Sequence, residues 1–191
     1  MKSSFLLLAG SLFAFSTAVA QKDSSGIYQT AADFQQKKLS YAINYRTEKH
    51  KIRTNILFDG NEIKVKHDGR TYTMDKARTY GFKDTKGNVY RFVDRKEYRV
   101  LNPEESILIY EFKHLAHSPK DAQTYQPEYF FSKDAVAELQ PLTKANLKAA
   151  FPDNHKFHDA LELQFRRNEE LIEYDSHHKV YKLNRIYTNN Q

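Results

Sequence analysis

The chain contains no cysteine and no tryptophan, and only 6 glycines and 5 prolines among its 191 residues. Without cysteine, the protein has no disulfide bonds, no thiol nucleophile, no cysteine-ligated metal and no site for lipid attachment through sulfur. The fold must therefore be held together by its hydrophobic core. Aromatic side chains supply much of that core, because the sequence has 13 Tyr and 13 Phe.

Only one long apolar run is present, and it lies within residues 1–20. A lysine near the start, an apolar run from Phe5 to Phe15 and the small residues Ala18-Val19-Ala20 are typical of a secretory signal peptide cleaved before Gln21. The run is short for a membrane-spanning helix of about 20 residues, which disfavours a membrane anchor. We expect an exported protein, periplasmic or extracellular, with no transmembrane segment after signal removal and with residues 21–191 forming a single domain.

The sequence also lacks the motifs of common catalytic and phosphate-binding sites. It has no glycine-rich phosphate loop, no Gly-x-Ser-x-Gly nucleophile elbow and no protein-kinase signature. The carboxylate pairs Glu104-Glu105 and Glu169-Glu170 fall in a predicted turn and on a predicted helix surface, where solvation explains them. These absences favour a non-enzymatic protein without a cofactor, and they leave catalysis as an open alternative.

Histidines provide the one pattern that suggests a metal. His114 and His117 form one His-x-x-His pair, and His155 and His158 form another. Two imidazoles with further ligands can hold a transition metal, so a hydrolase or metal-dependent envelope enzyme is one alternative function. Neither pair lies in an established ligand motif such as His-Glu-x-x-His, and metal-free surface histidines are the simpler interpretation.

Turn residues between positions 79 and 112 predict an antiparallel meander. Thr85-Lys86-Gly87 fits a three-residue hairpin loop with Gly87 at positive φ, which places Phe82 opposite Tyr90. A second three-residue loop at 94–96 and a turn at 102–105 extend the meander and put the apolar side chains on one face. The expected cross-strand pairs are Tyr80–Phe92, Phe92–Tyr98, Tyr90–Val100, Val100–Ile107 and Tyr98–Ile109.

A second meander is predicted over residues 51–74. Two-residue turns at Gly60-Asn61 and Asp68-Gly69 both select the face that carries Ile63 and Val65. The opposite face is then polar and cationic, as expected for an antiparallel sheet with one side in water. The expected pairs are Phe58–Ile63, Ile56–Val65, Val65–Tyr72 and Ile63–Met74.

Cap signals and apolar spacing predict the remaining elements. Thr30 and Asp33 fit a capping box for a helix through about residue 38. Thr143 fits the cap of a second helix over 144–151. Apolar residues that recur every four positions, at Phe157, Leu161 and Phe165, mark a third helix. A strand is expected at 39–45, with Leu39, Tyr41, Ile43 and Tyr45 alternating onto one face. Further strands are expected at 107–110, with both faces covered, and at 128–132; 171–187 fits helix or strand. The fold class is α+β: an antiparallel β-meander, curved or barrel-like, over 39–132, a short N-terminal helix, and two to three helices within 141–187.

Charge is unevenly distributed along the chain. Residues 46–99 hold 15 Lys and Arg against 8 Asp and Glu, whereas residues 100–191 hold 11 against 14. Arg53, Lys64 and Lys66 project together from the outer face of the second meander, and they are the predicted binding residues. An exported basic surface fits an anionic lipid, a polysaccharide or an acidic protein surface, whereas export argues against nucleic acid. We therefore expect a non-enzymatic binding or interaction protein of the cell envelope.

A third function is compatible with the aromatic face. If its rings line a cavity instead of filling a core, the protein would carry an apolar small molecule; close packing of protein interiors favours the filled core. The sequence leaves the oligomeric state open. The rings in question are Tyr80, Phe82, Tyr90, Phe92 and Tyr98.

Three motifs resemble those of small exported proteins frequent in Bacteroidota. They are Gly26-Ile27-Tyr28-Gln29-Thr30-x-x-Asp33-Phe34, Tyr80-Gly81-Phe82-Lys83-Asp84-x-x-Gly87-x-x-Tyr90-Arg91-Phe92 and Pro141-Leu142-Thr143-x-x-Asn146-Leu147. The resemblance spans most of the chain after residue 20 and implies an envelope or extracellular setting. It implies no particular activity, ligand or catalytic residue.

Overall fold

The computed structural model describes residues 24–46, 51–54, 60–113 and 126–191. The fold is α+β, as expected, and its main element is an open, eight-stranded antiparallel sheet of order β11-β10-β9-β8-β7-β6-β1-β2. The predicted signal peptide, residues 1–20, lies outside the described residues. The strands of this large sheet are β1 (Ser24–Tyr28), β2 (Ser40–Asn44), β6 (Gly81–Lys83), β7 (Val89–Val93), β8 (Lys96–Val100), β9 (Leu108–Phe112), β10 (Glu128–Ser132) and β11 (Gln140–Pro141).

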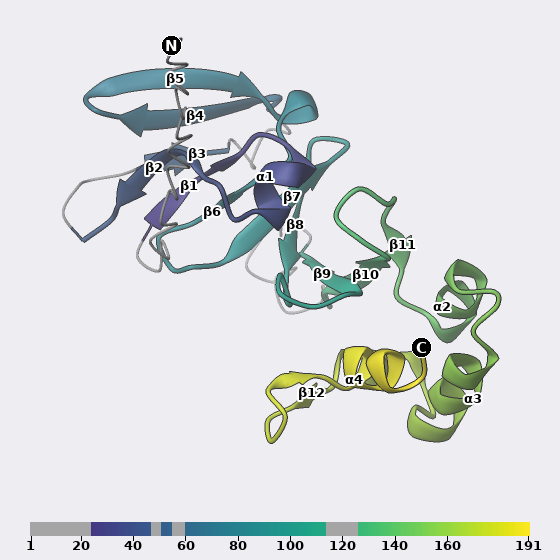
Figure 1. Ribbon diagram of the computed structural model, residues 1–191. Helices are drawn as coiled ribbons and strands as arrows, with labels where there is room; N and C mark the ends of the chain where they lie inside the picture. Colours follow the sequence, from purple (N-terminus) through teal and green to yellow (C-terminus); the bar gives the residue numbers. More distant parts are fainter. Residues whose placement is uncertain (1–23, 47–50, 55–59, 114–125) are drawn as a thin grey trace, which may run out of the picture.

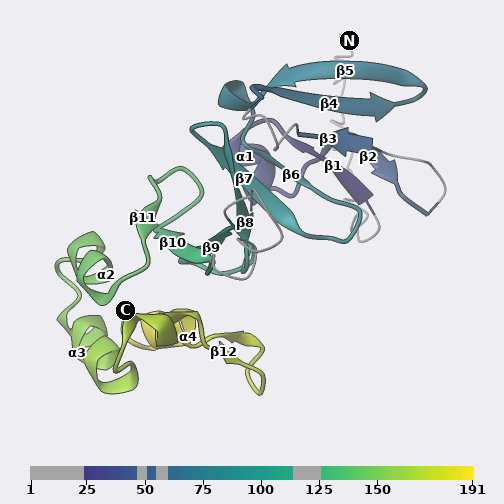
Figure 2. The ribbon, with the colours of Figure 1, turned by 180° about the vertical axis from the view of Figure 1, so that it is seen from behind.

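Two smaller sheets and the helices complete the fold. The small sheet, β3-β4-β5, lies at one end of the molecule, and α2, α3 and α4 lie together at the opposite end (Figures 1 and 2). A two-stranded hairpin, β12-β13, precedes α4. The bounds are β3 (Lys51–Arg53), β4 (Glu62–His67), β5 (Arg70–Asp75), β12 (Tyr174–Asp175), β13 (Val180–Tyr181), α1 (Ala31–Gln35), α2 (Lys144–Ala150), α3 (His155–Gln164) and α4 (Lys182–Asn189), with 3₁₀ turns η2 (Lys76–Arg78) and η4 (Asn168–Ile172).

The helix starts follow the predicted caps. At α1, the Asp33 amide donates to Thr30 Oγ1 (3.1 Å) and the Thr30 amide donates to Asp33 Oδ2 (3.0 Å), which is a complete capping box. At α2, the side chain of Thr143 accepts from the Asn146 amide (3.1 Å). The segment 171–187, for which helix and strand were both compatible, contains the β12-β13 hairpin and the first part of α4.

The first predicted hairpin is confirmed. Phe82 pairs with Tyr90, and the Phe92 amide donates to the Tyr80 carbonyl (2.8 Å). Gly87 has a φ of 85° in the three-residue loop, whose closing residues are joined by the Asp84 amide and the Asn88 carbonyl (2.9 Å). A positive φ is the conformation for which glycine is suited.

The second predicted turn is wrong by one residue. Asp94 and Arg95, with φ of 48° and 68°, form a two-residue turn, so Val93 pairs with Lys96. Because side chains alternate between the faces of a strand, this difference places Tyr98 on the opposite face from the expected one. The expected pairs Phe92–Tyr98 and Tyr90–Val100 are therefore wrong; the observed pairs are Phe92–Glu97, Tyr90–Arg99 and Arg91–Tyr98.

The pairing expected across the next turn, at 102–105, is also wrong. Val100 pairs with Tyr110, which excludes the expected pairs Val100–Ile107 and Tyr98–Ile109.

The small sheet agrees with the prediction at one turn only. Val65 pairs with Tyr72 and Ile63 with Met74 across the Asp68-Gly69 turn, as predicted. On its other side, Val65 pairs with Ile52. The pair Ile56–Val65 is therefore wrong, because Val65 already has Ile52 on one side and Tyr72 on the other. The predicted turn at Gly60-Asn61 and the pair Phe58–Ile63 depend on residues 55–59, which lie outside the described residues.

Strand β2 forms within the predicted range, but its expected alternation is interrupted. Tyr41 has a φ of 51°, and the pairing of β1 with β2 shifts register between Ser25 and Ile27. Leu39 consequently packs against one buried cluster and Tyr41 against another. The prediction of a single apolar face in this strand is therefore wrong.

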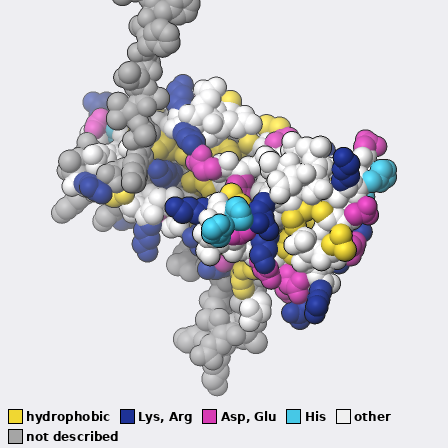
Figure 3. All heavy atoms as spheres, turned by 60° about the horizontal axis from the view of Figure 1, so that its bottom comes forward, with side chains coloured by type: hydrophobic (Ala, Val, Ile, Leu, Met, Phe, Trp, Pro, Cys, Tyr) yellow, Lys and Arg dark blue, Asp and Glu magenta, His cyan; other side chains and the backbone are white. Residues whose placement is uncertain are grey.

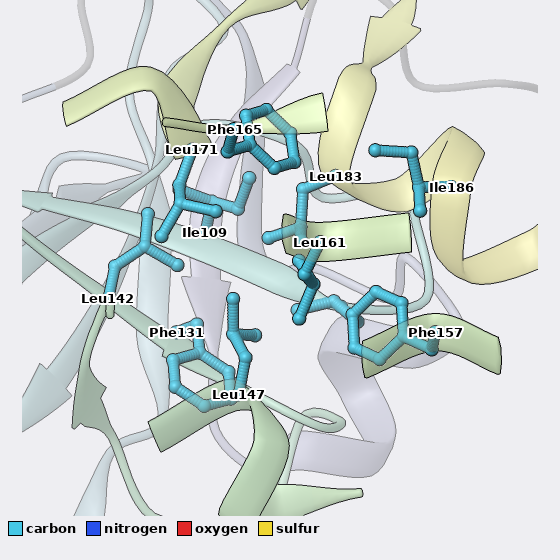
Figure 4. Close-up of a cluster of buried hydrophobic side chains, with 11 residues drawn as sticks. Ile109, Phe131, Leu142, Leu147, Phe157, Leu161, Phe165, Leu171, Leu183 and Ile186 are labelled. Carbon is cyan, nitrogen blue, oxygen red and sulfur yellow. The ribbon is translucent and has the colours of Figure 1, made fainter. Parts of the chain in front are cut away.

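Hydrophobic clusters cover both faces of the large sheet. The small-sheet cluster packs Ile63 and Val65 against Ile27, Phe82 and Phe92. The helix-side cluster lies between β9, β10 and the C-terminal helices, and Figure 4 shows its side chains converging from these elements. Its buried members are Ile107, Ile109, Phe131, Leu142, Leu147, Phe157, Leu161, Phe165, Leu171, Leu183 and Ile186. The third cluster lies on the opposite face and comprises Tyr28, Phe34, Val89, Tyr98, Val100, Leu108, Tyr110 and Ala135.

Strand β9 is covered on both faces, as predicted for residues 107–110. Ile109 belongs to the helix-side cluster, whereas Leu108 and Tyr110 belong to the third cluster. The amphipathic stripe is confirmed for Phe157 and Leu161 of α3, whereas Phe165 is the extended residue that ends the helix; all three side chains are fully buried in the helix-side cluster. The C-terminal helices therefore share one core with the sheet.

Two asparagines satisfy backbone groups in the connection between β8 and β9, and one of them, Asn184, fastens α4 to the sheet. Asn184 Oδ1 accepts from the Ile107 amide (2.8 Å), and Asn184 Nδ2 donates to the Ile107 carbonyl (2.8 Å). Asn102 makes a similar pair of bonds across the same turn, with the Ile109 amide (2.6 Å) and the Ile107 carbonyl (2.7 Å). These side chains form hydrogen bonds with the buried backbone groups between β8 and β9. Burial of those groups without a hydrogen bond would lower the stability of the fold.

Candidate functional site

The structure brings the predicted basic residues together. Arg53 pairs directly with Lys64 across β3 and β4, and Lys66 lies two positions further along β4. All three are exposed, and they alternate with Ile63 and Val65, which are fully buried. We call Arg53, Lys64 and Lys66 the basic face of the small sheet.

Acidic residues limit the basic face at one end. Glu62 pairs with Asp75 across β4 and β5, and Glu62 Oε2 lies 3.6 Å from Lys64 Nζ. On the neighbouring strand β5, Lys64 and Lys66 face Thr73 and Thr71, which carry no charge. The positive charge of the basic face therefore lies on β3 and β4 and does not extend to β5.

Surface charge elsewhere is mixed. The face shown in Figure 3 carries basic and acidic side chains next to one another, with apolar side chains visible between them. In the C-terminal part, for example, Glu162 lies between Lys144 (2.7 Å) and Lys148 (2.5 Å). The C-terminal basic residues are thus partly neutralised by local pairs.

The histidines do not form a ligand set among the described residues. The rings of His155 and His158 are 5.7 Å apart in a T-shaped arrangement, and His158 Nε2 lies 2.9 Å from the Phe151 carbonyl oxygen. Within the described part of the chain, no group of three or more His, Asp or Glu side chains is placed to hold a metal ion. His114 and His117 lie outside the described residues.

The five aromatic residues of the carrier hypothesis do not share one face. Phe82, Tyr90 and Phe92 belong to or pack against the small-sheet cluster, whereas Tyr80 and Tyr98 contact the third cluster across the sheet. Each set packs closely, with ring centroids 4.7 Å apart for Phe82 and Tyr90. The rings therefore fill two cores and do not line a common space.

Sequence reasoning missed a row of side chains across four adjacent strands of the large sheet. Tyr90 on β7 pairs with Arg99 on β8, Arg99 with Glu111 on β9, and Glu111 with Tyr129 on β10. Directly paired residues project from the same face. We call Tyr90, Arg99, Glu111 and Tyr129 the cross-sheet row.

The centre of the cross-sheet row is a charge network. Arg99 Nη1 lies 3.6 Å from Glu111 Oε2, and Arg99 Nη2 donates to Asn88 Oδ1 (3.1 Å). Lys113 Nζ approaches the same Glu111 oxygen at 3.3 Å. The Glu111 side chain is only 12% exposed, while the side chains of Arg99 and Lys113 are 42% and 67% exposed. The carboxylate is thus largely enclosed, and the two cations face solvent.

Tyrosines flank this network on both sides. Tyr90 packs against the small-sheet cluster and Tyr129 against the helix-side cluster, and both remain partly exposed. Burial raises the pKa of Tyr129, and the charge of Glu111 raises it further. Burial and then the charge of Asp84 raise the pKa of Tyr90, whereas Arg99 acts in the opposite direction. Both phenols are therefore protonated at neutral pH and can donate a hydrogen bond.

A buried guanidinium lies on the other face of the sheet. Arg91 Nη1 donates to Tyr110 Oη (3.1 Å), and Nη2 donates to the Ala137 carbonyl (3.0 Å). The same group stacks on Tyr80, 5.3 Å from the ring centroid. Arg91 is 8% exposed, and its bonds fasten the segment after β10 to the sheet, which gives it a structural role.

Comparison of the chain with protein-family models, with curated proteins and with solved structures returns no match. Among the described residues, no helix has the length and apolar character needed to cross a membrane.

Proposed function

We propose that this chain is a non-enzymatic, exported binding protein of the cell envelope that recognises an anionic partner. The basic face of the small sheet carries this proposal. Arg53 and Lys64 are directly opposite one another, and all three basic side chains are exposed on a sheet whose other face is buried.

Electrostatics favours an anion at this face. Directly opposed like charges on neighbouring strands repel, and Arg53 has a positively charged neighbour at Lys64. An anionic group placed between them replaces repulsion by attraction. Because such exposed charges are screened over about 8 Å at physiological ionic strength, binding should weaken strongly as salt is added.

The test compares two double variants of the mature chain at low salt. Lys64→Glu with Lys66→Glu is expected to abolish binding to phosphatidylglycerol vesicles and to polygalacturonate, measured by co-sedimentation. Lys133→Glu with Lys156→Glu makes the same charge change at two exposed residues outside the small sheet, and should bind like the wild type. Lys144 and Lys148 are unsuitable controls, because both pair with Glu162.

Two results would contradict the proposal: no binding of the wild type to either probe at low salt, or an equal loss of binding in both double variants. The second result would mean that only the net charge matters. The Lys133→Glu and Lys156→Glu variant should also keep the salt sensitivity of the wild type, because it keeps the basic face.

Export is the second part of the proposal, and it rests on the pattern of residues 1–20. Mass spectrometry of material exported by a bacterial host should show a chain that begins at Gln21, in part cyclised to pyroglutamate. Recovery of the intact chain, with residues 1–20 attached, from the membrane fraction would support an anchor instead.

A further inference from the structure

We infer that the cross-sheet row of Tyr90, Arg99, Glu111 and Tyr129 is a binding surface for an acidic polysaccharide. This inference rests on the proposed function, because it names the class of anionic partner. It also adds a second surface to the basic face of the small sheet, and the two surfaces use different chemistry.

The row has the shape of a track for a linear chain. Its four residues are directly paired across β7, β8, β9 and β10. Three strand spacings of about 4.8 Å separate the outer strands, so the row spans about 14 Å. A short run of linked sugar rings can lie along such a line, crossing the strands.

The side chains of the row match the two kinds of surface on a sugar. The C–H face of a sugar ring packs on an aromatic ring, and partly exposed tyrosines stand at both ends of the row, at Tyr90 and Tyr129. Sugar hydroxyls both donate and accept hydrogen bonds. Between the tyrosines, the guanidinium of Arg99 is a donor, the carboxylate of Glu111 is an acceptor, and the protonated phenols can act as either.

Charge selects an acidic sugar over a neutral one. The only carboxylate of the row, Glu111, is 12% exposed and already lies near Arg99 and Lys113. The side chains of Arg99 and Lys113 are 42% and 67% exposed, so their remaining N–H groups can donate hydrogen bonds to a ligand. A guanidinium binds a carboxylate through two parallel hydrogen bonds, and a uronic acid carries that group on its sugar ring.

The row is held in place by the fold and does not depend on a loop. Tyr90 stacks on Phe82 with an interplanar angle of 9°, and Arg99 is bonded to Asn88. Its ends are fixed by two separate hydrophobic clusters. A surface built on paired strands is ordered before binding, which lowers the entropic cost of association.

The test measures binding of polygalacturonate by isothermal titration calorimetry. Tyr90→Leu and Tyr129→Leu remove a ring but keep an apolar side chain, and Arg99→Gln removes the charge. Each is expected to weaken polygalacturonate binding about tenfold, which corresponds to about 1.4 kcal/mol, with smaller effects on phosphatidylglycerol vesicles. Tyr187→Leu is the matched control, because Tyr187 is a partly buried tyrosine of α4 that contacts Phe151, and it should bind like the wild type.

The outcomes separate this inference from the proposed function. If polygalacturonate binding is lost with Lys64→Glu and Lys66→Glu but unchanged in the three row variants, the proposed function stands and the row is not the polysaccharide site. If the row variants lose binding while the lysine variant keeps it, the row is the site and the basic face is not. Equal affinity for polygalacturonate and for a neutral glucan would overturn the selection for acidic sugars. Circular dichroism of each variant shows that a loss of binding is not a loss of fold.

Discussion

Lys76 and Glu97 form a buried ion pair between the small sheet and the large one. Lys76 Nζ lies 3.3 Å from Glu97 Oε1, and the two side chains are 2% and 9% exposed. Lys76 follows β5 directly, whereas Glu97 lies on β8. Burial raises the pKa of Glu97, while Thr54 and Lys76 act in the opposite direction. The pair therefore joins two units that carry the two proposed binding surfaces.

Removal of one partner should be costly. Lys76→Met leaves the Glu97 carboxylate buried without its cation, and we expect a loss of about 3–5 kcal/mol in the free energy of unfolding at pH 7. Because Glu97 can escape the penalty by taking up a proton, the loss should shrink as the pH falls towards 5. Urea denaturation at both pH values measures this. The double variant Lys76→Met with Glu97→Leu should recover much of the stability; a double variant as unstable as the single one would contradict the account.

The Asp94-Arg95 turn offers a test of the corrected register. Arg95 has a φ of 68°, a conformation that costs an L-residue about 1 kcal/mol or more relative to glycine. Arg95→Gly should therefore stabilise the fold by about 1 kcal/mol and raise the midpoint of thermal unfolding. A three-residue loop at this place would give no such gain, so an unchanged or lower midpoint would count against the two-residue turn.

Two glycines are required for different reasons. A Cβ at Gly87 would meet nothing within 4 Å, but φ is 85°, so Gly87→Val should cost about 1–3 kcal/mol through backbone strain alone. A Cβ at Gly81 would lie 1.9 Å from the Tyr90 carbonyl oxygen. Gly81→Ala should therefore destabilise the protein more than Gly87→Val, although its side chain is smaller. Thermal unfolding of the two variants in one buffer decides the order.

Glu162 should contribute to the acid sensitivity of the C-terminal helices. Hydrogen bonds from Lys144 and Lys148 lower its pKa from 4.5 to about 2. A carboxyl whose pKa is lower in the folded state stabilises the fold above pH 4.5, and this contribution disappears as the pH falls towards 2. Glu162→Gln should lower the midpoint of thermal unfolding at pH 6 and have no effect near pH 2. Glu169→Gln, at another exposed position, is the control; an equal effect in both variants would contradict the role of the lysine pairs.

Local signals determined much of the fold. The Thr30–Asp33 capping box and the Thr143 cap depend on residues three apart, and both were found as predicted. The apolar stripe of α3 and the loop at Gly87 likewise depend on short stretches of sequence. The basic face also followed from alternation, because Lys64 and Lys66 flank Val65 on a strand with one buried side. Such features form because neighbouring residues suffice to stabilise them.

Only the tertiary structure decided the registers that build the cross-sheet row. Neither Asp94 nor Arg95 is a glycine, so nothing in the sequence marks the positive φ at both positions, and a two-residue turn cannot be told from a three-residue one. The difference of one residue in the length of this turn decides whether Arg99 or Val100 lies opposite Tyr90. The pairing of Glu111 with Tyr129 joins residues 18 positions apart, beyond the reach of any local pattern. Registers of this kind are fixed by which side chains the opposing clusters can bury, and that is a property of the whole fold.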